Sequence, residues 1–180
     1  MKILNLLKKS FLVVSRRAIS LLEYIDVDLY MSAFAWYLKR IGIDLIGKPR
    51  YISGSAYFDG ADYRKIHLGD NITISREVMF LTHDYSITTA LASTGTIIPR
   101  GSGEMYILDD IVVGKNCFIG ARASILPGTR IGDNVVVGAG SLVRGTIADG
   151  CIVAGNPAKA IAFTREWVEK KIRLGKYLVQ

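Results

Sequence analysis

Hydrophobic positions recur with a period of six through the middle of the chain. The period is carried by Ile107, Val113, Ile119, Ile125, Ile131, Val137 and Val143. Glycine often follows these residues, and a small or β-branched residue usually stands four positions after them. A six-residue period is typical of a triangular coil in which each unit supplies one flat side and one corner, so that about 18 residues complete a turn. Stacking of such coils buries aliphatic side chains that a single coil would leave exposed.

The same pattern begins earlier and is broken once. Repeat units start at Leu68 and at Ile74, and a weaker form near Leu45 opens the pattern. Residues 84–106 are polar, contain glycine and are out of register, so they are predicted to form a loop extruded from the coil. Long loops on rigid scaffolds are often functional. We therefore expect one domain over residues 45–163 that includes this loop.

Helical periodicity replaces the period of six at both ends. In residues 2–25 apolar side chains at three- and four-residue spacing predict an amphipathic helix with basic residues opposite, and a second apolar segment follows within the N-terminal segment 1–44. Two interpretations stay open for this segment: packing on the body or on a neighbouring subunit, and binding of a basic amphipathic helix to a membrane surface. Residues 164–180 predict a C-terminal helix, with Thr164 as its N-cap and Trp167 placed to pack back on the body.

The net charge of +7 lies at the two ends of the chain. Residues 1–50 hold nine Lys and Arg against four Asp and Glu, residues 157–180 hold six against two, and residues 51–156 hold eight against ten. No nucleic-acid-binding motif accompanies the basic residues, so a nucleic acid is not an expected partner. Anionic lipid at one end and the phosphates of a small-molecule ligand at the other fit the basic ends at least as well.

Cysteine usage and hydropathy indicate the compartment. The two cysteines, Cys117 and Cys151, show neither a metal-binding nor a disulfide spacing, which is usual in a reducing compartment. The apolar cluster at residues 11–14 is flanked closely by basic pairs and is too short for a secretory signal or a membrane span. We expect a cytoplasmic protein, with peripheral contact at the inner membrane face as the open alternative.

Two stretches carry a resemblance to a known family: IVVGKNCFIGARASILPGTRIGDNVVVGAGSLV at 111–143 and IVAGNPAKAI at 152–161. They resemble the hexapeptide-repeat acetyltransferases, in particular sugar O-acetyltransferases of the maltose and galactoside type and their polysaccharide-modifying relatives. The resemblance implies an all-β fold, a left-handed parallel β-helix of hexapeptide repeats with N-terminal α-helices and a C-terminal α-helix. It also implies a homotrimer with active sites between neighbouring prisms, acetyl-CoA as co-substrate, and no metal.

Only two histidines, His67 and His83, are available as a general base. His83 stands where the regular repeats stop and the extruded loop begins, which is where the resembling enzymes keep their catalytic histidine. An imidazole can accept a proton near neutral pH, so His83 is the predicted base. Asp84 is a candidate for orienting the ring, and a backbone carbonyl is the alternative. His67 is expected to be structural, and two histidines are too few for a three-histidine zinc site of the carbonic anhydrase type.

The resemblance assigns five residues to acyl-CoA. The main-chain N–H of Ala121 would donate to the oxyanion or thioester, Ala139 would line the pantetheine groove, and Lys159 would lie near the phosphates. Phe118 stands where a tryptophan is common and offers an apolar wall. Arg144, with the glycine after it, replaces a Thr-Lys pair, so the phosphate contact there is either rearranged or supplied by Arg144.

The sequence therefore predicts an O-acetyltransferase acting on a saccharide or a saccharide precursor, as in polysaccharide biosynthesis. An acetyltransferase for a serine or amine acceptor and a non-catalytic trimeric scaffold are the alternatives.

Overall fold

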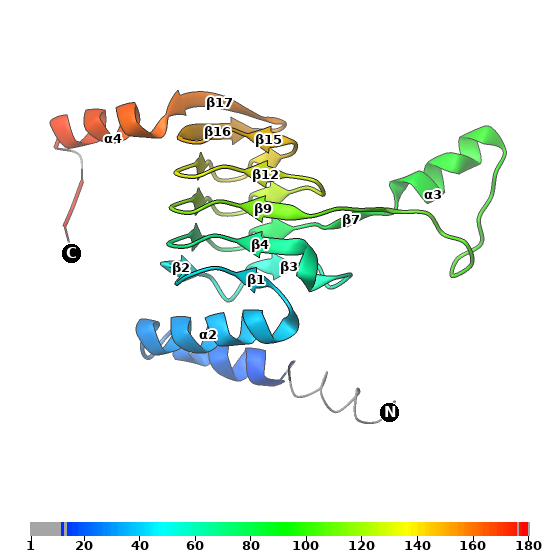
Figure 1. Ribbon diagram of the computed structural model, residues 1–180, viewed down its shortest axis with the longest axis horizontal. Coiled ribbons are helices and arrows are strands. Elements are labelled where there is room, and N and C mark those ends of the chain that lie inside the picture. The colour runs from blue at the N-terminus through cyan, green and yellow to red at the C-terminus, as the bar shows by residue number, and fades with distance from the viewer. Residues whose placement is uncertain (1–11, 13, 176, 180) are drawn as a thin grey trace.

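The computed structural model describes residues 12, 14–175 and 177–179 and shows a three-sided prism with helices at both ends (Figure 1). Three parallel sheets, here called faces A, B and C, form its sides. Face A contains β1 (Asp44–Leu45), β4 (Ile66–Leu68), β9 (Ile111–Val113), β12 (Arg130–Ile131) and β15 (Thr146–Ile147). Face B contains β2 (Tyr51–Ile52), β5 (Thr73–Ile74), β10 (Phe118–Ile119), β13 (Val136–Val137) and β16 (Cys151–Gly155), with β17 (Ala158–Phe163) antiparallel at its edge. Face C contains β3 (Tyr57–Phe58), β6 (Met79–Phe80), β11 (Ser124–Ile125) and β14 (Leu142–Val143).

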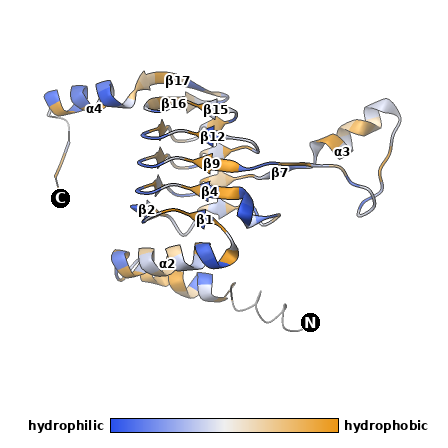
Figure 2. Ribbon diagram, in the orientation of Figure 1, coloured by the Kyte–Doolittle hydropathy of each residue, from blue (hydrophilic) through white to orange (hydrophobic). Residues whose placement is uncertain are grey.

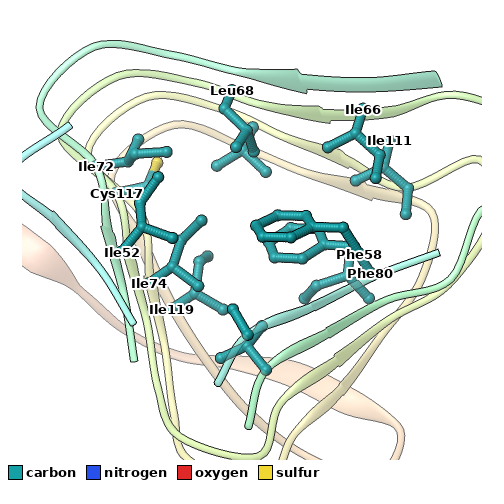
Figure 3. Close-up of a cluster of buried hydrophobic side chains, with 14 of the residues drawn as sticks. Ile52, Phe58, Ile66, Leu68, Ile72, Ile74, Phe80, Ile111, Cys117 and Ile119 are labelled. Carbon is teal, nitrogen blue, oxygen red and sulfur yellow. The ribbon is translucent and has the colours of Figure 1, made fainter. Parts of the chain in front are cut away.

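The aliphatic residues of the six-residue period stack along the inside of the prism. Ile119 pairs with Val137 on face B, and Ile125 pairs with Val143 on face C. All four are fully buried. Figure 3 shows the stack from above, with Ile52, Ile74 and Ile119 in one column and Phe58 over Phe80 in another. The fold class is confirmed: the chain is a left-handed parallel β-helix of hexapeptide repeats. Its apolar segments gather on strands such as β4 and β9 (Figure 2).

Ile107, the first residue of the period, does not join this stack. It lies in β8 (Ile107–Leu108) and is half exposed, so the core of the third coil begins at Ile111 and Val113. β8 pairs antiparallel with β7 (His83–Asp84). The resulting ribbon carries α3 (Ser86–Ala90) and the 3-10 turn η2 (Leu91–Thr94) away from the prism (Figure 1). The predicted loop is thus an arm, named here the extruded arm, with secondary structure of its own.

The turns at the edges of the prism repeat one backbone conformation. At the A–B edge Asn71, Asn116 and Asn134 adopt positive φ angles of 52°, 56° and 58°. Their side chains form a ladder, since the Asn71 amide donates to Asn116 at 2.9 Å and the Asn116 amide donates to Asn134 at 3.1 Å. Asparagine tolerates the left-handed conformation because its short polar side chain bonds locally. The ladder holds successive coils in register at this edge.

The N-terminal helices close one end of the prism. α2 (Val27–Ile41) starts at Asp26, whose side chain accepts from the Leu29 N–H, and stops at Gly42 in the left-handed conformation. Its inner face buries Tyr30, Phe34 and Leu38, and the Tyr30 hydroxyl donates to the Ile52 carbonyl at 2.7 Å. The structure therefore bears out packing on the body for this face. Aromatic burial of this kind is a main source of stabilisation at a domain end.

The preceding helix lies against the same end. Residues 14–22 are helical, and the Arg16 guanidinium donates to the carbonyl oxygens of Gly54 and Ala56 at 3.2 and 2.9 Å. The part of the predicted 2–25 helix at residues 2–11 and 13 falls outside the described residues. Within the described part of the chain, no helix is both long enough and apolar enough to cross a bilayer.

At the other end β16 and β17 form a hairpin that leads into α4 (Thr164–Arg173). The N-cap is Phe163 rather than Thr164. Thr164 is the first helical residue, and its hydroxyl donates to the Cys151 carbonyl at 3.4 Å. Trp167 does not pack back on the body as expected, because α4 projects from the prism and buries none of its residues (Figure 1).

Candidate active site

His83 lies at the C–A edge of the prism, where the chain leaves face C for the extruded arm. β6 delivers it there: the ring of Phe80 stacks on Phe58 at 5.1 Å inside the prism, and the Leu81 N–H bonds to the Ile125 carbonyl at 2.9 Å. Thr82 is fully buried. The backbone is thus fixed up to the residue before the imidazole, whose side chain remains 30% exposed and accessible to a substrate.

The carboxylate that meets the imidazole is Asp59, from the coil below. One of its oxygens, Oδ2, accepts from the Thr82 N–H and hydroxyl, both at 3.0 Å, and from the His83 N–H at 3.2 Å. The same oxygen contacts His83 Nδ1. Oδ1 accepts from the Ala61 N–H at 3.2 Å. Asp59 is only 2% exposed, so these donors take the place of water around a buried charge.

These contacts determine the ionisation of Asp59. Burial acts to raise its pKa, but the hydrogen bonds from Ala61, Thr82 and His83 stabilise the charged form and together hold the pKa below its usual value. An ionised carboxylate only accepts hydrogen bonds, so it places the ring proton on Nδ1 and leaves the lone pair on Nε2. A histidine in this tautomer can take a proton from a hydroxyl that reaches Nε2.

Two tyrosines of the extruded arm frame the imidazole. The rings of Tyr85 and Tyr106 stack at 4.7 Å, and each meets the His83 ring edge-on, at 5.2 and 6.5 Å. Both tyrosines are nearly half exposed. Aromatic surfaces beside a base can hold the face of a sugar ring while leaving its hydroxyls free.

Asp84, the carboxylate suggested by the sequence, faces away from this arrangement. Its Oδ1 atom accepts a hydrogen bond from the Ser86 N–H at 2.7 Å, at the start of the extruded arm. That backbone hydrogen bond is the main reason why the pKa of Asp84 is below its usual value. Side chains of adjacent residues in an extended strand point to opposite faces, which explains why the neighbour in sequence does not orient the ring.

The residues predicted for acyl-CoA lie mostly along a different edge. Ala121 and Ala139 occupy the B–C edge in successive coils, where the Gly140 N–H bonds to the Ala121 carbonyl at 2.8 Å. The Ala121 N–H has no acceptor among the described residues and is free to donate to a ligand. Lys159 pairs with Ala154 in the β16–β17 hairpin next to this column, and its side chain is exposed.

Phe118 and Arg144 complete the predicted set. Phe118 is exposed on the outer surface of face B, close in sequence to Ala121. Arg144 is exposed but lies at the C–A edge, in the column that also holds His83 and Asp59. In one copy of the chain, therefore, His83 and Arg144 share one edge while Ala121, Ala139 and Lys159 share another.

His67 lies close to two carboxylates. Its Nδ1 lies 3.1 Å from Asp44 and its Nε2 lies 3.9 Å from Asp110, on the outer surface of face A. No group of metal-ligating side chains occurs within the described residues. Burial raises the pKa of the Cys117 thiol to about 11, which excludes this residue as a nucleophile near neutral pH.

Comparison with known proteins identifies the class. The family described as bacterial transferase hexapeptide (six repeats) matches residues 110–145. Protein CapG of Staphylococcus aureus is 33% identical to this chain over 124 residues, which cover 69% of this chain and 67% of CapG. The chain belongs to the hexapeptide-repeat transferase family.

Particular relatives carry more specific descriptions. The putative lipopolysaccharide biosynthesis O-acetyl transferase WbbJ of Escherichia coli is 36% identical over 56% of this chain and 54% of its own length. A galactoside acetyltransferase solved in complex with coenzyme A superposes with a TM-score of 0.56 at 22% identity, over 88% of this chain and 84% of that one, and shows the same fold. The match spans only about half the length of WbbJ.

Proposed function

We propose that the protein transfers an acetyl group from acetyl-CoA to a hydroxyl of a saccharide or saccharide precursor in the cytoplasm, with His83 as general base. The observation that carries the proposal is the His83–Asp59 pair: a buried, ionised carboxylate fixes the ring on one side and leaves its other nitrogen open. Family membership and the description of WbbJ as an O-acetyl transferase support the reaction class. Asp59 replaces Asp84 as the orienting group in this proposal.

The reaction then follows from the geometry of the pair. Nε2 of His83 takes the hydroxyl proton as the acceptor oxygen attacks the thioester carbonyl, and the imidazolium that forms is stabilised by the carboxylate of Asp59. The negative carbonyl oxygen is stabilised by the Ala121 N–H. Collapse of this intermediate breaks the carbon–sulfur bond, and the leaving thiolate recovers the proton from His83. The products are an O-acetyl ester and free coenzyme A.

We propose further that the complete site forms between copies of the chain in a homotrimer. The base lies at the C–A edge and the free Ala121 N–H lies at the B–C edge, so one copy does not bring them together. The B–C edge of a neighbour, placed against the C–A edge of the first copy, would supply the groove with Ala139 for pantetheine and Lys159 for phosphate. Phe118 would then form an apolar wall, and Arg144 of the first copy would add a second cation.

The test is acetyl-CoA turnover, followed as release of the free thiol with a panel of sugars and nucleotide-sugars, and with serine and amines for comparison. His83→Ala should lower kcat by roughly 10²- to 10⁴-fold, the usual contribution of a general base, while folding and CoA affinity are retained. His67→Ala is the matched control and should keep wild-type turnover. A wild-type protein that binds no CoA and turns over no acceptor would instead support the scaffold.

A further inference from the structure

A groove of about 620 Å³ runs between α2 and the A–B edge of the first coil, whereas His83 lies at the C–A edge. Met31, Ala35 and Trp36 supply its apolar wall from the helix. Lys48 and Arg50 supply the opposite rim from the turn between β1 and β2. The groove thus combines an indole and aliphatic surface with cationic side chains.

The charge of the groove is unbalanced. Lys39, Lys48 and Arg50 are exposed, and none of them forms an ion pair within the described part of the chain. Asp28 is the one carboxylate among the lining residues, so three cations stand against one anion. Unpaired cations gathered in one concave site favour an anionic ligand.

The face of α2 that points away from the prism continues this surface. Leu29 and Trp36 are seven residues apart, about two helical turns, so they lie on the same face. Both are about half exposed, although the opposite face of the helix is fully buried. Arg40 is exposed one turn beyond Trp36. Tryptophan beside basic residues is typical of side chains at a membrane interface.

The helix at residues 14–22 adds to the same end. It packs on the prism through Ile19 and Arg16, while Val14 and Leu21 are about two-thirds exposed and Arg17 is exposed between them. Both helices lie against one end of the prism (Figure 1), and these residues are exposed on them. We call the set formed by Val14, Leu21, Leu29, Trp36, Lys39, Lys48 and Arg50 the end surface.

We infer that the end surface docks on a bilayer that contains anionic phospholipid. Leu29, Trp36 and the outer residues of the first helix enter the headgroup region, while Lys39, Lys48 and Arg50 extend to the lipid phosphates around the groove. A second copy of the same end fits less well, because it carries the same excess of positive charge. Docking on the bilayer does not depend on acyl transfer. It would orient the prism with its N-terminal helices toward the membrane.

The experiment is co-sedimentation of the full chain with vesicles of phosphatidylcholine alone and of phosphatidylcholine with phosphatidylglycerol. Wild type should bind the anionic vesicles and lose binding in high salt. The variant Lys39→Gln/Lys48→Gln/Arg50→Gln, called the groove variant, should bind these vesicles at least about tenfold less tightly. Each basic residue near an anionic surface contributes about fivefold to binding. The matched control, Lys170→Gln/Lys171→Gln/Arg173→Gln on α4, removes the same charge from the other end and should bind like wild type.

A second measurement reports the contact itself. In a Trp167→Phe background the emission of Trp36 should shift to shorter wavelength with anionic vesicles and stay unchanged with neutral ones. Equal binding by wild type and the groove variant, or loss of binding in the α4 control alone, would overturn the inference. So would an unshifted Trp36 in protein that sediments with vesicles. An unchanged circular dichroism spectrum and an unchanged thermal unfolding midpoint would show that the groove variant is folded.

Discussion

At the scale of single residues, Asp59 sets what the imidazole of His83 is able to do. Its Oδ2 atom collects donors from Thr82 and from both the backbone and the ring of His83, all on one buried oxygen. Such a carboxylate fixes the tautomer and the orientation of the ring and stabilises the imidazolium of the transition state. In the proposed reaction it is therefore a positioning residue, which acts through His83.

Asp59→Asn tests that role. The amide keeps the shape but loses the charge, and its NH₂ group cannot accept the Nδ1 proton. We expect kcat to fall by roughly 10²- to 10⁴-fold with little change in KM, measured as thiol release from acetyl-CoA. Asp84→Asn separates the two carboxylates. A loss of kcat in Asp84→Asn but not in Asp59→Asn would mean that Asp84, not Asp59, orients the base.

The stability of the fold should also depend on Asp59. Because its pKa in the folded protein lies below the usual 3.8, ionised Asp59 stabilises the fold above that pH, and this contribution is lost as pH falls from there through the folded pKa. Urea unfolding at a series of acidic pH values should show wild type losing stability over that range. Asp59→Asn should be less stable at neutral pH and lose less on acidification. Parallel curves for the two proteins would contradict the assignment.

The sequence pointed to His83 but not to Asp59, and the reason is topological. The two residues are 24 positions apart, and no local motif joins them. Their contact arises because Phe58 pairs with Phe80 in successive coils, which sets the residues after them at the same edge. The six-residue spacing between Ile52 and Phe58 could have indicated that Phe58 belongs to the repeat and that Asp59 follows it at the same edge. An insertion containing the 3-10 turn η1 (Tyr63–Lys65) lengthens the first coil and so interrupts the six-residue period in the sequence.

At the scale of strands and turns, the glycines after the buried aliphatic residues determine how closely the coils stack. The six-residue spacing predicted where the inward residues stand, and it showed that glycine often follows them without giving the reason. The structure gives a reason for the repeated positions: Gly120 does not have a positive φ, but a methyl group there would lie 2.6 Å from the Ala139 nitrogen. Neighbours across coils cannot be seen in a local pattern.

Gly120→Ala tests this packing. The contact is with backbone, which cannot rotate away, so the coils must separate, and the free energy of unfolding should fall by about 1–3 kcal/mol, measured by thermal or urea unfolding. Gly140→Asn is the control, since φ is 69° there, nothing lies within 4 Å of an added Cβ, and asparagine readily adopts this conformation. Equal destabilisation by both variants would rule out close stacking as the cause.

At the scale of the whole molecule, the sequence predicted the prism because its period of six is local and repeats many times. It did not predict the exposed α4, nor the ribbon of β7 and β8, because neither belongs to the repeat and both depend on tertiary contacts. The same reasoning applies to the site. Repeats place His83 on one edge and Ala139 on another, and only an arrangement of copies can decide whether these edges meet.

Mixing two inactive variants tests whether the C–A and B–C edges of different copies meet in one site. His83→Ala lacks the base, and Ala139→Trp fills the proposed pantetheine groove, so each protein alone should show almost no acetyl-CoA turnover. If a site combines the C–A edge of one copy with the B–C edge of the next, co-expressed mixed trimers contain sites with an intact histidine facing an intact groove, and activity returns. If each site lay within a single copy, no mixture could restore it. Turnover by the purified mixture, with each homogeneous variant as control, therefore reports on the shared site independently of which acceptor is used.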